Sequence, residues 1–546
     1  MGSQWHPGSS PVHMKRRNFL SLTAASVALG IGKADEQTPS SPGPNRVGDL
    51  PLEELTIEQI QGAFANGRMT AESLSLAYLE RIRALDSKTV NAVIEVNPDA
   101  LQIAAALDAE RKVKGPRGPL HGVPVLIKDN IDTADKMMTT AGSLALIGSI
   151  AGQDSAVAAR LRVAGAVILG KTNLSEWANF RSNHSISGWS GRGGQTRNPF
   201  ALDRNPSGSS AGTGAGISAN FAAVGVGTET DGSIVSPSSC NGLVGIKPTV
   251  GLIARSGIIP ISHTQDTAGP MARTVRDAAI LLGALGGPDP RDPASATAAP
   301  HAQADYTKFL DAGGLRGARL GIARKFFGQS PLGDQIMEEA IAALKQAGAL
   351  IIDPADLPSH GKFGDAELDV LLYEFKYGLN KYLEATAPTN KVRTLTDLIA
   401  FNSANASREL TYFEQDTLEI ADKKGPLTDK AYLDALEKCR KLSRDEGIDA
   451  ALKQNNLDAI VAMTNGPACY IDVVNRDSDT GGCSQPAAVA GYPHITVPAG
   501  YARGLPVGIS FFGAAWSEPK LIQFAYSYEQ ATKVRRAPAF SSTITG

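Results

Sequence analysis

The chain has 546 residues, 42% of them hydrophobic and 20% charged, which is typical of a globular protein with a large core and not of a disordered chain. Lysine and arginine number 53 and the acidic residues 55, so the formal net charge is −2. A protein whose main partner is nucleic acid or an anionic membrane usually carries a basic surplus, so we expect neither partner. The four cysteines form no Cys-x-x-Cys pair, and we expect no disulfide scaffold, no metal and no cofactor.

Residues 1–33 are predicted to be a leader that stands outside the fold. Residues 1–13 are rich in Gly, Ser, Pro and His and carry no hydrophobic pattern. Paired arginines at 16–17 then precede a modest apolar stretch; this resembles a twin-arginine export signal, although a disordered basic arm is the alternative. The stretch is too short to span a bilayer, so we expect bacterial export to the periplasm or medium without a membrane anchor. Residues 34–50 are predicted to be a flexible linker.

The hydrophobic periodicity then predicts helices alternating with short buried strands. Apolar side chains at three- and four-residue steps or helix-forming composition predict helices over residues 56–66, 70–85, 98–114 and 156–164. Uninterrupted apolar runs predict strands over residues 123–127, 167–169, 221–226, 457–463 and 494–498. This alternation predicts an α/β sheet wrapped by helices.

Residues from about 305 to 454 have a different character. They are more charged, mostly helical in pattern, and carry four aromatic residues close together between 373 and 382. We interpret part of this region as a helical excursion over the core, and we expect residues 51–546 to form one domain that includes it.

A lysine follows the predicted strand at 123–127. Lys128 could simply reach water from the strand end, which is the usual position of a lysine. In a low-dielectric site its pKa would instead fall, and it could act as a base near neutral pH. Taken alone, the segment favours the first interpretation.

Residues 205–214 are rich in Ser and Gly and precede helix-forming residues. The segment is either a flexible loop or a helix start, where hydroxyls and backbone N–H groups favour an anion. Residues 208–212 also match G-x-S-x-G, the nucleophile elbow of α/β-hydrolases. That motif requires a strand directly before it, and the polar, turn-rich residues 200–206 do not supply one.

Residues 227–234 come directly after the apolar run at 221–226. A strand end followed by a Gly-containing turn would present consecutive backbone N–H groups beside Ser233. Donors aimed at a developing negative oxygen are what an oxyanion hole requires, and a plain strand-to-helix turn is the alternative.

Together, and in this order, these segments resemble the amidase signature family from about residue 52 to 538. The resemblance also includes residues 170–173, 242–249 and 265–273. Within the family, the bacterial peptide amidases, which release ammonia from the C-terminal carboxamide of peptides, are most similar at residues 174–180, 187–190 and 513–520. The resemblance implies a central mixed, twisted β-sheet covered on both faces by helices, with the helical excursion over the active site.

The resemblance implies a Ser–Ser–Lys triad and an acyl-enzyme, with Ser233 as nucleophile, Ser209 as proton relay and Lys128 as base. It implies an oxyanion hole formed by the backbone N–H groups of Thr230, Asp231, Gly232 and Ser233. Candidate substrate-binding residues are Ser210, Asn179, Trp177 and Phe180, although aromatic residues at such spacings more often belong to the core.

Two features depart from the common family pattern. Ser207-Gly208 and Ala211-Gly212 stand where many members have paired glycines, and Asp231 stands where glycine is frequent. The aspartate recurs among the peptide-amidase-like members.

The expected substrate is a peptide or small-molecule amide, and the expected state is a monomer or homodimer. The alternatives are a hydrolase of aryl or alkyl amides, carbamates or esters, an amidotransferase subunit, and an inactive binding module.

Overall fold

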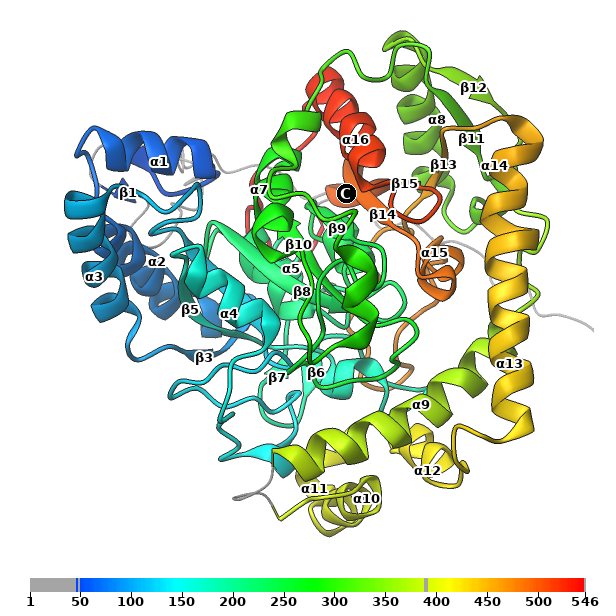
Figure 1. Cartoon of the computed structure of the whole chain (residues 1–546), viewed down its shortest axis with the longest axis horizontal. Coiled ribbons are helices and arrows are strands. Elements are labelled where there is room, and N and C mark those ends of the chain that lie inside the picture. Colours follow the sequence, from blue (N-terminus) through cyan, green and yellow to red (C-terminus); the bar gives the residue numbers. More distant parts are fainter. Residues whose placement is uncertain (1–45, 48–49, 387–390, 545–546) are drawn as a thin grey trace, which may run out of the picture. The chain divides into compact units, whose positions relative to one another are not determined.

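The computed structural model describes residues 46–47, 50–386 and 391–544, and all of them belong to one compact unit (Figure 1). The predicted leader at 1–33 lies outside these residues. The end of the predicted linker forms a short antiparallel pair of β1 (Arg46–Val47) and β2 (Leu50–Pro51). In the described part of the chain, no helix has both the length and the apolar character needed to cross a membrane.

An eleven-stranded mixed sheet occupies the centre of the molecule. Its order is β12 (Leu350–Ile352), β11 (Arg319–Ile322), β13 (Ala459–Met463), β15 (Leu505–Phe512), β14 (His494–Ala502), β9 (Val244–Lys247), β10 (Thr267–Ala272), β8 (Val224–Glu229), β4 (Pro124–Lys128), β5 (Val167–Thr172) and β3 (Val93–Val96). β4 pairs in parallel with both β5 and β8, whereas β8 and β9 pair antiparallel with β10. Two further strands, β6 (Trp189–Ser190) and β7 (Gly194–Gln195), pair separately.

Helices cover both faces of the sheet, so the predicted fold class is confirmed (Figure 1). The first two, α1 (Ile57–Ala65) and α2 (Ala71–Leu85), begin at capping boxes of Thr56 and Thr70. The other helices packed around the sheet are α3 (Ala100–Lys114), α4 (Ala156–Val163), α5 (Ala211–Ser218), α6 (Val235–Cys240), α7 (Val275–Leu285), α8 (Pro331–Gln346), α15 (Gln485–Ala490) and α16 (Glu518–Thr532).

The helical excursion begins later than the expected residue 305. The pair β11 and β12, with α8 between them, adds two parallel strands to the edge of the main sheet. Strands of three and four residues are too short to show a periodic pattern, so the sequence analysis missed them. The helical layer consists of α9 (Gly364–Ala385), α10 (Leu395–Ala404), α11 (Ala406–Glu409), α12 (Asp416–Asp422), α13 (Lys430–Arg440) and α14 (Asp449–Asn455).

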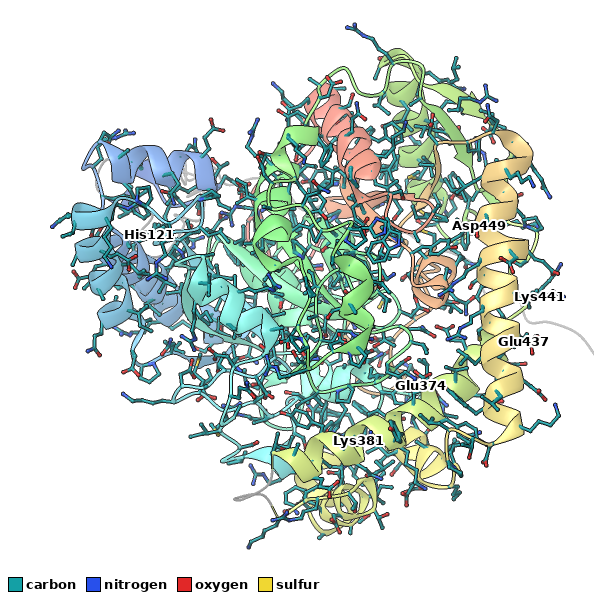
Figure 2. All side chains as sticks on the ribbon, in the orientation of Figure 1. His121, Glu374, Lys381, Glu437, Lys441 and Asp449 are labelled. Atoms are coloured by element: carbon teal, nitrogen blue, oxygen red, sulfur yellow. The ribbon has the colours of Figure 1, made fainter. Side chains whose placement is uncertain are left out.

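The helical layer carries polar side chains on its helices and an apolar core between them. Figure 2 shows Glu374 and Lys381 on α9 and Glu437 on α13. It also shows Lys441, which begins the π-helical segment Lys441–Ile448, and Asp449, which begins α14. The apolar faces of α9, α10 and α12 enclose a second hydrophobic core, separate from the core of the sheet. The layer is therefore attached to the body by burial of apolar surface, as well as by polar contacts.

Candidate active site

Two parallel strands bring the predicted site residues to one edge of the sheet. β4 ends at Lys128, and its register pairs Ile127 with Val226 of β8. The carboxyl ends of parallel neighbours meet at the same sheet edge, where α/β proteins bind their ligands. Lys128 therefore lies beside the turn that follows Glu229, the last residue of β8.

Lys128 is fully buried and does not reach water. Its Nζ donates to the Ser209 hydroxyl at 2.7 Å, to the Thr228 hydroxyl at 2.9 Å and to the Thr228 carbonyl at 3.2 Å. Burial lowers the pKa of Lys128 to about 7, and the carboxylates of Asp266 and Glu229 oppose that shift. A neutral lysine is therefore accessible near physiological pH.

Ser209 precedes α5, and the peptide bond between Gly208 and Ser209 is cis. The side chain is fully buried, and the Ser209 carbonyl accepts from the Ser175 N–H at 3.1 Å. Residues 200–206 form turns and isolated bridges, with no strand. The predicted helix start is thus present, and the strand that a nucleophile elbow requires is absent from this described segment.

The turn before α6 carries Ser233 and four unpaired donors. Glu229 Oε2 accepts from the N–H groups of Ile234 at 2.7 Å and Val235 at 3.0 Å. By contrast, the N–H groups of residues 230–233 donate to no atom of the described chain. Buried backbone donors are rarely left without an acceptor, so this row of N–H groups is suited to bind an anionic oxygen. Gly232 has φ +76°, which favours glycine in the middle of the turn.

Thr230 and Asp266 connect this turn to the next loop. The Thr230 hydroxyl donates to Asp266 Oδ1 at 2.6 Å, and Asp266 Oδ2 accepts from the N–H groups of Ile261 at 2.9 Å and Ser262 at 2.8 Å. Burial raises the pKa of Asp266 to about 6. Neither Thr228 nor Asp266 was predicted from the sequence as a site residue. A threonine at a strand end and an aspartate before a strand carry no pattern of their own.

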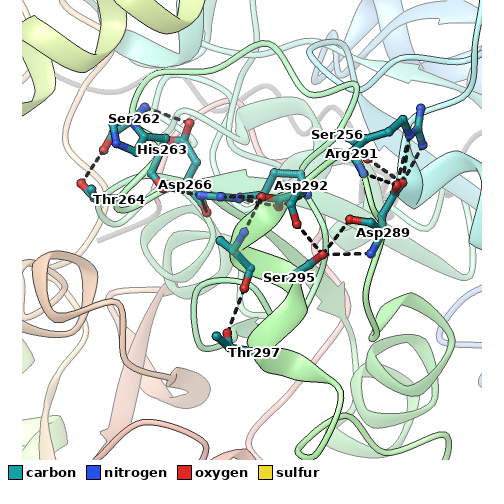
Figure 3. A network of polar contacts seen from close by, with 12 residues as sticks. Ser256, Ser262, His263, Thr264, Asp266, Asp289, Arg291, Asp292, Ser295 and Thr297 are labelled. Carbon is teal, nitrogen blue, oxygen red and sulfur yellow. Dashed lines mark hydrogen bonds and ion pairs between the residues drawn. The ribbon is translucent and has the colours of Figure 1, made fainter. Parts of the chain in front are cut away.

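A cavity of about 190 Å³ opens beside these residues. Its lining includes Thr228, Thr230 and Asp266 on one side, and an apolar wall of residues 258–261 on another. Its rim carries two arginines in ion pairs, Arg255 with Asp292 at 2.8 Å and Arg291 with Asp289 at 2.7 Å. Figure 3 shows Ser295 between the backbones of Asp289 and Asp292: its hydroxyl accepts from the Asp289 N–H at 2.9 Å and donates to the Asp292 carbonyl at 2.7 Å. The rim is therefore a connected polar network.

The four candidate substrate-binding residues occupy different environments. Ser210 is fully buried, and its hydroxyl donates to the Thr228 carbonyl at 3.0 Å. Trp177 and Phe180 belong to the second hydrophobic core, where the rings of Phe180 and Phe375 lie 4.9 Å apart.

Asn179 is exposed, with φ +71°, and its side chain accepts from the Ser185 hydroxyl at 2.8 Å. The neighbouring residue Ala178 lines the cavity. The segment that the sequence analysis selected thus borders the cavity, although its large side chains point into the core. Among the described residues, no group of three or more His, Cys, Asp or Glu side chains could hold a metal ion.

A family model described as Amidase matches residues 73–522. The chain belongs to the amidase signature family. Its structure is similar to that of the peptide amidase of Stenotrophomonas maltophilia, with a TM-score of 0.85 and 52% identity over 90% of this chain and 99% of that chain. A probable amidase of Arabidopsis thaliana is 43% identical over 531 residues, covering 96% of this chain and 97% of its own. A candidate amidase of Schizosaccharomyces pombe is 38% identical over 518 residues, covering 90% and 88%. The predicted family is confirmed, and the amidase-family chain is an amide-hydrolysing enzyme.

The prediction of bacterial export is wrong. The Arabidopsis thaliana and Schizosaccharomyces pombe amidases, which match most of the chain, are plant and fungal proteins, and this does not fit a bacterial twin-arginine signal. A pair of arginines before a modest apolar stretch is a short and unspecific pattern, because a basic arm has the same composition. The segment itself lies outside the described residues.

Proposed function

We propose that this amidase uses a Ser–Ser–Lys triad of Ser233, Ser209 and Lys128 to hydrolyse carboxamides through an acyl-enzyme. The observation that carries the proposal is the 2.7 Å contact between the buried Nζ of Lys128 and the Ser209 hydroxyl. We further propose that the substrate is the C-terminal amide of a peptide, which is hydrolysed to the acid and ammonia.

The contacts of Lys128 suit a neutral amine. An uncharged Nζ has two N–H bonds and one lone pair, and the two oxygens of Thr228 accept from it at 2.9 and 3.2 Å. When both N–H bonds point to Thr228, the lone pair is left facing Ser209, which can then donate its O–H to the nitrogen. Thr228 thus holds the base in the orientation that proton transfer requires.

The reaction follows from this arrangement. Lys128 takes the proton of Ser209 as Ser209 takes the proton of Ser233, and the Ser233 oxygen attacks the amide carbon. The N–H groups of residues 230–233 bind the resulting oxyanion. The relay then returns a proton to the leaving nitrogen, and ammonia departs. Water attacks the acyl-enzyme by the same route, and this step regenerates Ser233.

The peptide-amide substrate is supported by the 52% identity to the Stenotrophomonas maltophilia peptide amidase. Ammonia release from an N-acylated dipeptide amide, run beside an aryl anilide, tests this choice. We expect ammonia from the peptide amide and little anilide turnover. Anilide turnover without ammonia would place the enzyme among aryl-amide hydrolases. Co-purifying partner subunits would instead support an amidotransferase subunit.

The protonation of Lys128 predicts the acid side of the pH profile. Its folded-state pKa is lowered to about 7, so the amine is protonated below that pH and cannot accept a proton. We expect kcat/KM to rise as pH increases through about 7, because kcat/KM reports the free enzyme. Initial rates between pH 5 and 9 measure this. A profile that stays flat from pH 5 to 8, with the fold intact, would contradict the assignment of Lys128 as base.

A further inference from the structure

One acidic side chain of the helical layer reaches the back of the 230–233 turn. Glu367 lies in the first turn of α9 and is 5% exposed. Its Oε1 accepts from Gln265 Nε2 at 3.0 Å, and its Oε2 accepts from Gln485 Nε2 at 2.8 Å. The same Gln265 Nε2 donates to the Thr230 carbonyl at 3.3 Å. A single amide group therefore connects Glu367 to the turn.

The Thr230 carbonyl shares its peptide plane with the N–H of Asp231. In a planar trans peptide the C=O and N–H bonds point in opposite directions, so an acceptor held on one side fixes the donor on the other. Gln265 holds the carbonyl, and the Asp231 N–H is thereby held in its orientation. Without this link, the peptide could rotate and withdraw one donor from the row of free N–H groups.

The carboxyl of Asp231 faces the same buried region as Glu367. Its Oδ1 is buried and has no hydrogen-bond partner among the described residues, and Ser484 hydrogen-bonds the carboxylate. The turn also packs closely here, since a Cβ on Gly232 would lie 3.0 Å from Ser484 Oγ. Any negative charge on Glu367 or Asp231 therefore lies close to the 230–233 turn.

Two carboxyl groups in a dry interior do not ionise together easily. Burial and the charge of Asp231 raise the pKa of Glu367 to about 8, and burial also raises the pKa of Asp231. Glu367 is therefore mostly protonated near neutral pH and ionises at alkaline pH. The other titratable or charged groups around the pair are Glu229, Lys247, Cys439, Arg444 and Cys483.

We propose that Glu367 is a positioning residue for the oxyanion-binding turn, because it anchors the Thr230–Asp231 peptide through Gln265. This inference rests on the proposed function, which assigns the 230–233 turn to the oxyanion. Ionisation of Glu367 at alkaline pH adds negative charge behind the N–H groups and weakens their hold on the oxyanion. Hydrolysis should therefore decline on the alkaline side of the pH profile.

Two substitutions at Glu367 distinguish its role as an anchor of the Thr230–Asp231 peptide from the effect of its charge. Glu367→Gln keeps an acceptor for Gln265 and removes the titrating group, so we expect wild-type kcat at pH 7 and no alkaline decline. Glu367→Leu removes both the acceptor for Gln265 and the titrating group. We expect kcat to fall on the order of 10–100-fold at every pH, with KM changed less than about twofold. Both are measured as kcat and KM from pH 6 to 10, with whichever amide the wild-type enzyme hydrolyses.

Glu529→Gln is the matched control. Glu529 is a carboxyl on α16 whose pKa burial raises to about 7, and it accepts from the Val275 N–H at 2.7 Å. Because it contacts no part of the 230–233 turn, its variant should keep the wild-type pH profile. If Glu367→Leu does not fold, Gln265→Met breaks the same link from the other end and should give the same loss of kcat.

An alkaline decline that persists in Glu367→Gln, or wild-type kcat in Glu367→Leu, would overturn this inference. The proposed function would survive that result if Ser233→Ala were inactive. Turnover by Ser233→Ala would instead overturn the proposed function itself, whatever the Glu367 variants do.

Discussion

Replacing Ser233 with alanine is expected to lower kcat for amide hydrolysis by roughly 10⁴–10⁶-fold, the scale of loss when a triad enzyme loses its nucleophile. The hydroxyls of Ser209 and Ser210 are not free to replace it, because Ser209 is bound to Lys128 and Ser210 to Thr228. The cavity and the free N–H groups remain, so substrate affinity should change little. Ammonia release under saturating substrate measures the loss.

The fold should tolerate this change. Ser233 is 8% exposed, and no hydrogen bond between its hydroxyl and another described residue would be lost on replacement by alanine. Ser238→Ala, at a fully buried serine on α6, is the matched control and should retain wild-type kcat. Thermal unfolding of both variants should match the wild type. Turnover by Ser233→Ala within tenfold of wild type would exclude Ser233 as the nucleophile.

The elements that the sequence predicted well have strong local signals. The Thr56 and Thr70 caps and the apolar steps that follow them located α1 and α2 within a residue or two. The apolar run at 123–127 located β4, whose five residues are all buried. Such runs are recognisable because a strand covered on both faces needs no polar alternation.

The strands that the sequence analysis missed owe their conformation to neighbours distant in the chain. β10 contains Gly and Pro, which weaken a strand pattern. The structure shows why Gly269 is needed, since a Cβ there would lie 2.1 Å from the Ile246 carbonyl of β9. A close approach of this kind depends on tertiary pairing and leaves no periodic signal.

The residues of the candidate site also divide into those that a local motif predicted and those that depend on tertiary contacts. Lys128, Ser209 and Ser233 were predicted from a resemblance in motif, and the structure brings Lys128 and Ser209 into contact although they lie 81 positions apart. A residue proposed to act by holding the turn in place has no recognisable sequence pattern. Glu367, for example, lies more than a hundred positions from the turn it supports. Burial also decided the interpretation of Lys128, which its position in the sequence alone placed in water.

Replacing Lys128 is expected to cause the second large loss of activity. Lys128→Ala removes the proton acceptor and should lower kcat by roughly 10²–10⁴-fold, the usual contribution of a general base. The effect should be greatest on acylation, because Ser209 then has no base to receive the proton of Ser233. Stopped-flow measurement of acyl-enzyme formation separates this step from deacylation.

Loss of any buried lysine also costs stability, so the comparison needs a second buried lysine. Lys171 on β5 is fully buried as well, and its Nζ donates to the Ile131 carbonyl at 2.6 Å and to the Thr139 hydroxyl at 3.0 Å. Lys171→Ala should lower the thermal unfolding temperature while the folded fraction keeps its kcat. A similar loss of kcat in both variants would mean that the effect of Lys128 is structural.

Lys128→Arg distinguishes a proton acceptor from a fixed positive charge. An arginine stays protonated at any pH the enzyme survives, so it offers no lone pair to Ser209 even where it keeps the charge. We therefore expect the arginine variant to be as inactive as Lys128→Ala between pH 6 and 10. Activity in Lys128→Arg would mean that the buried cation stabilises the oxyanion electrostatically, and Ser233 would then need another base.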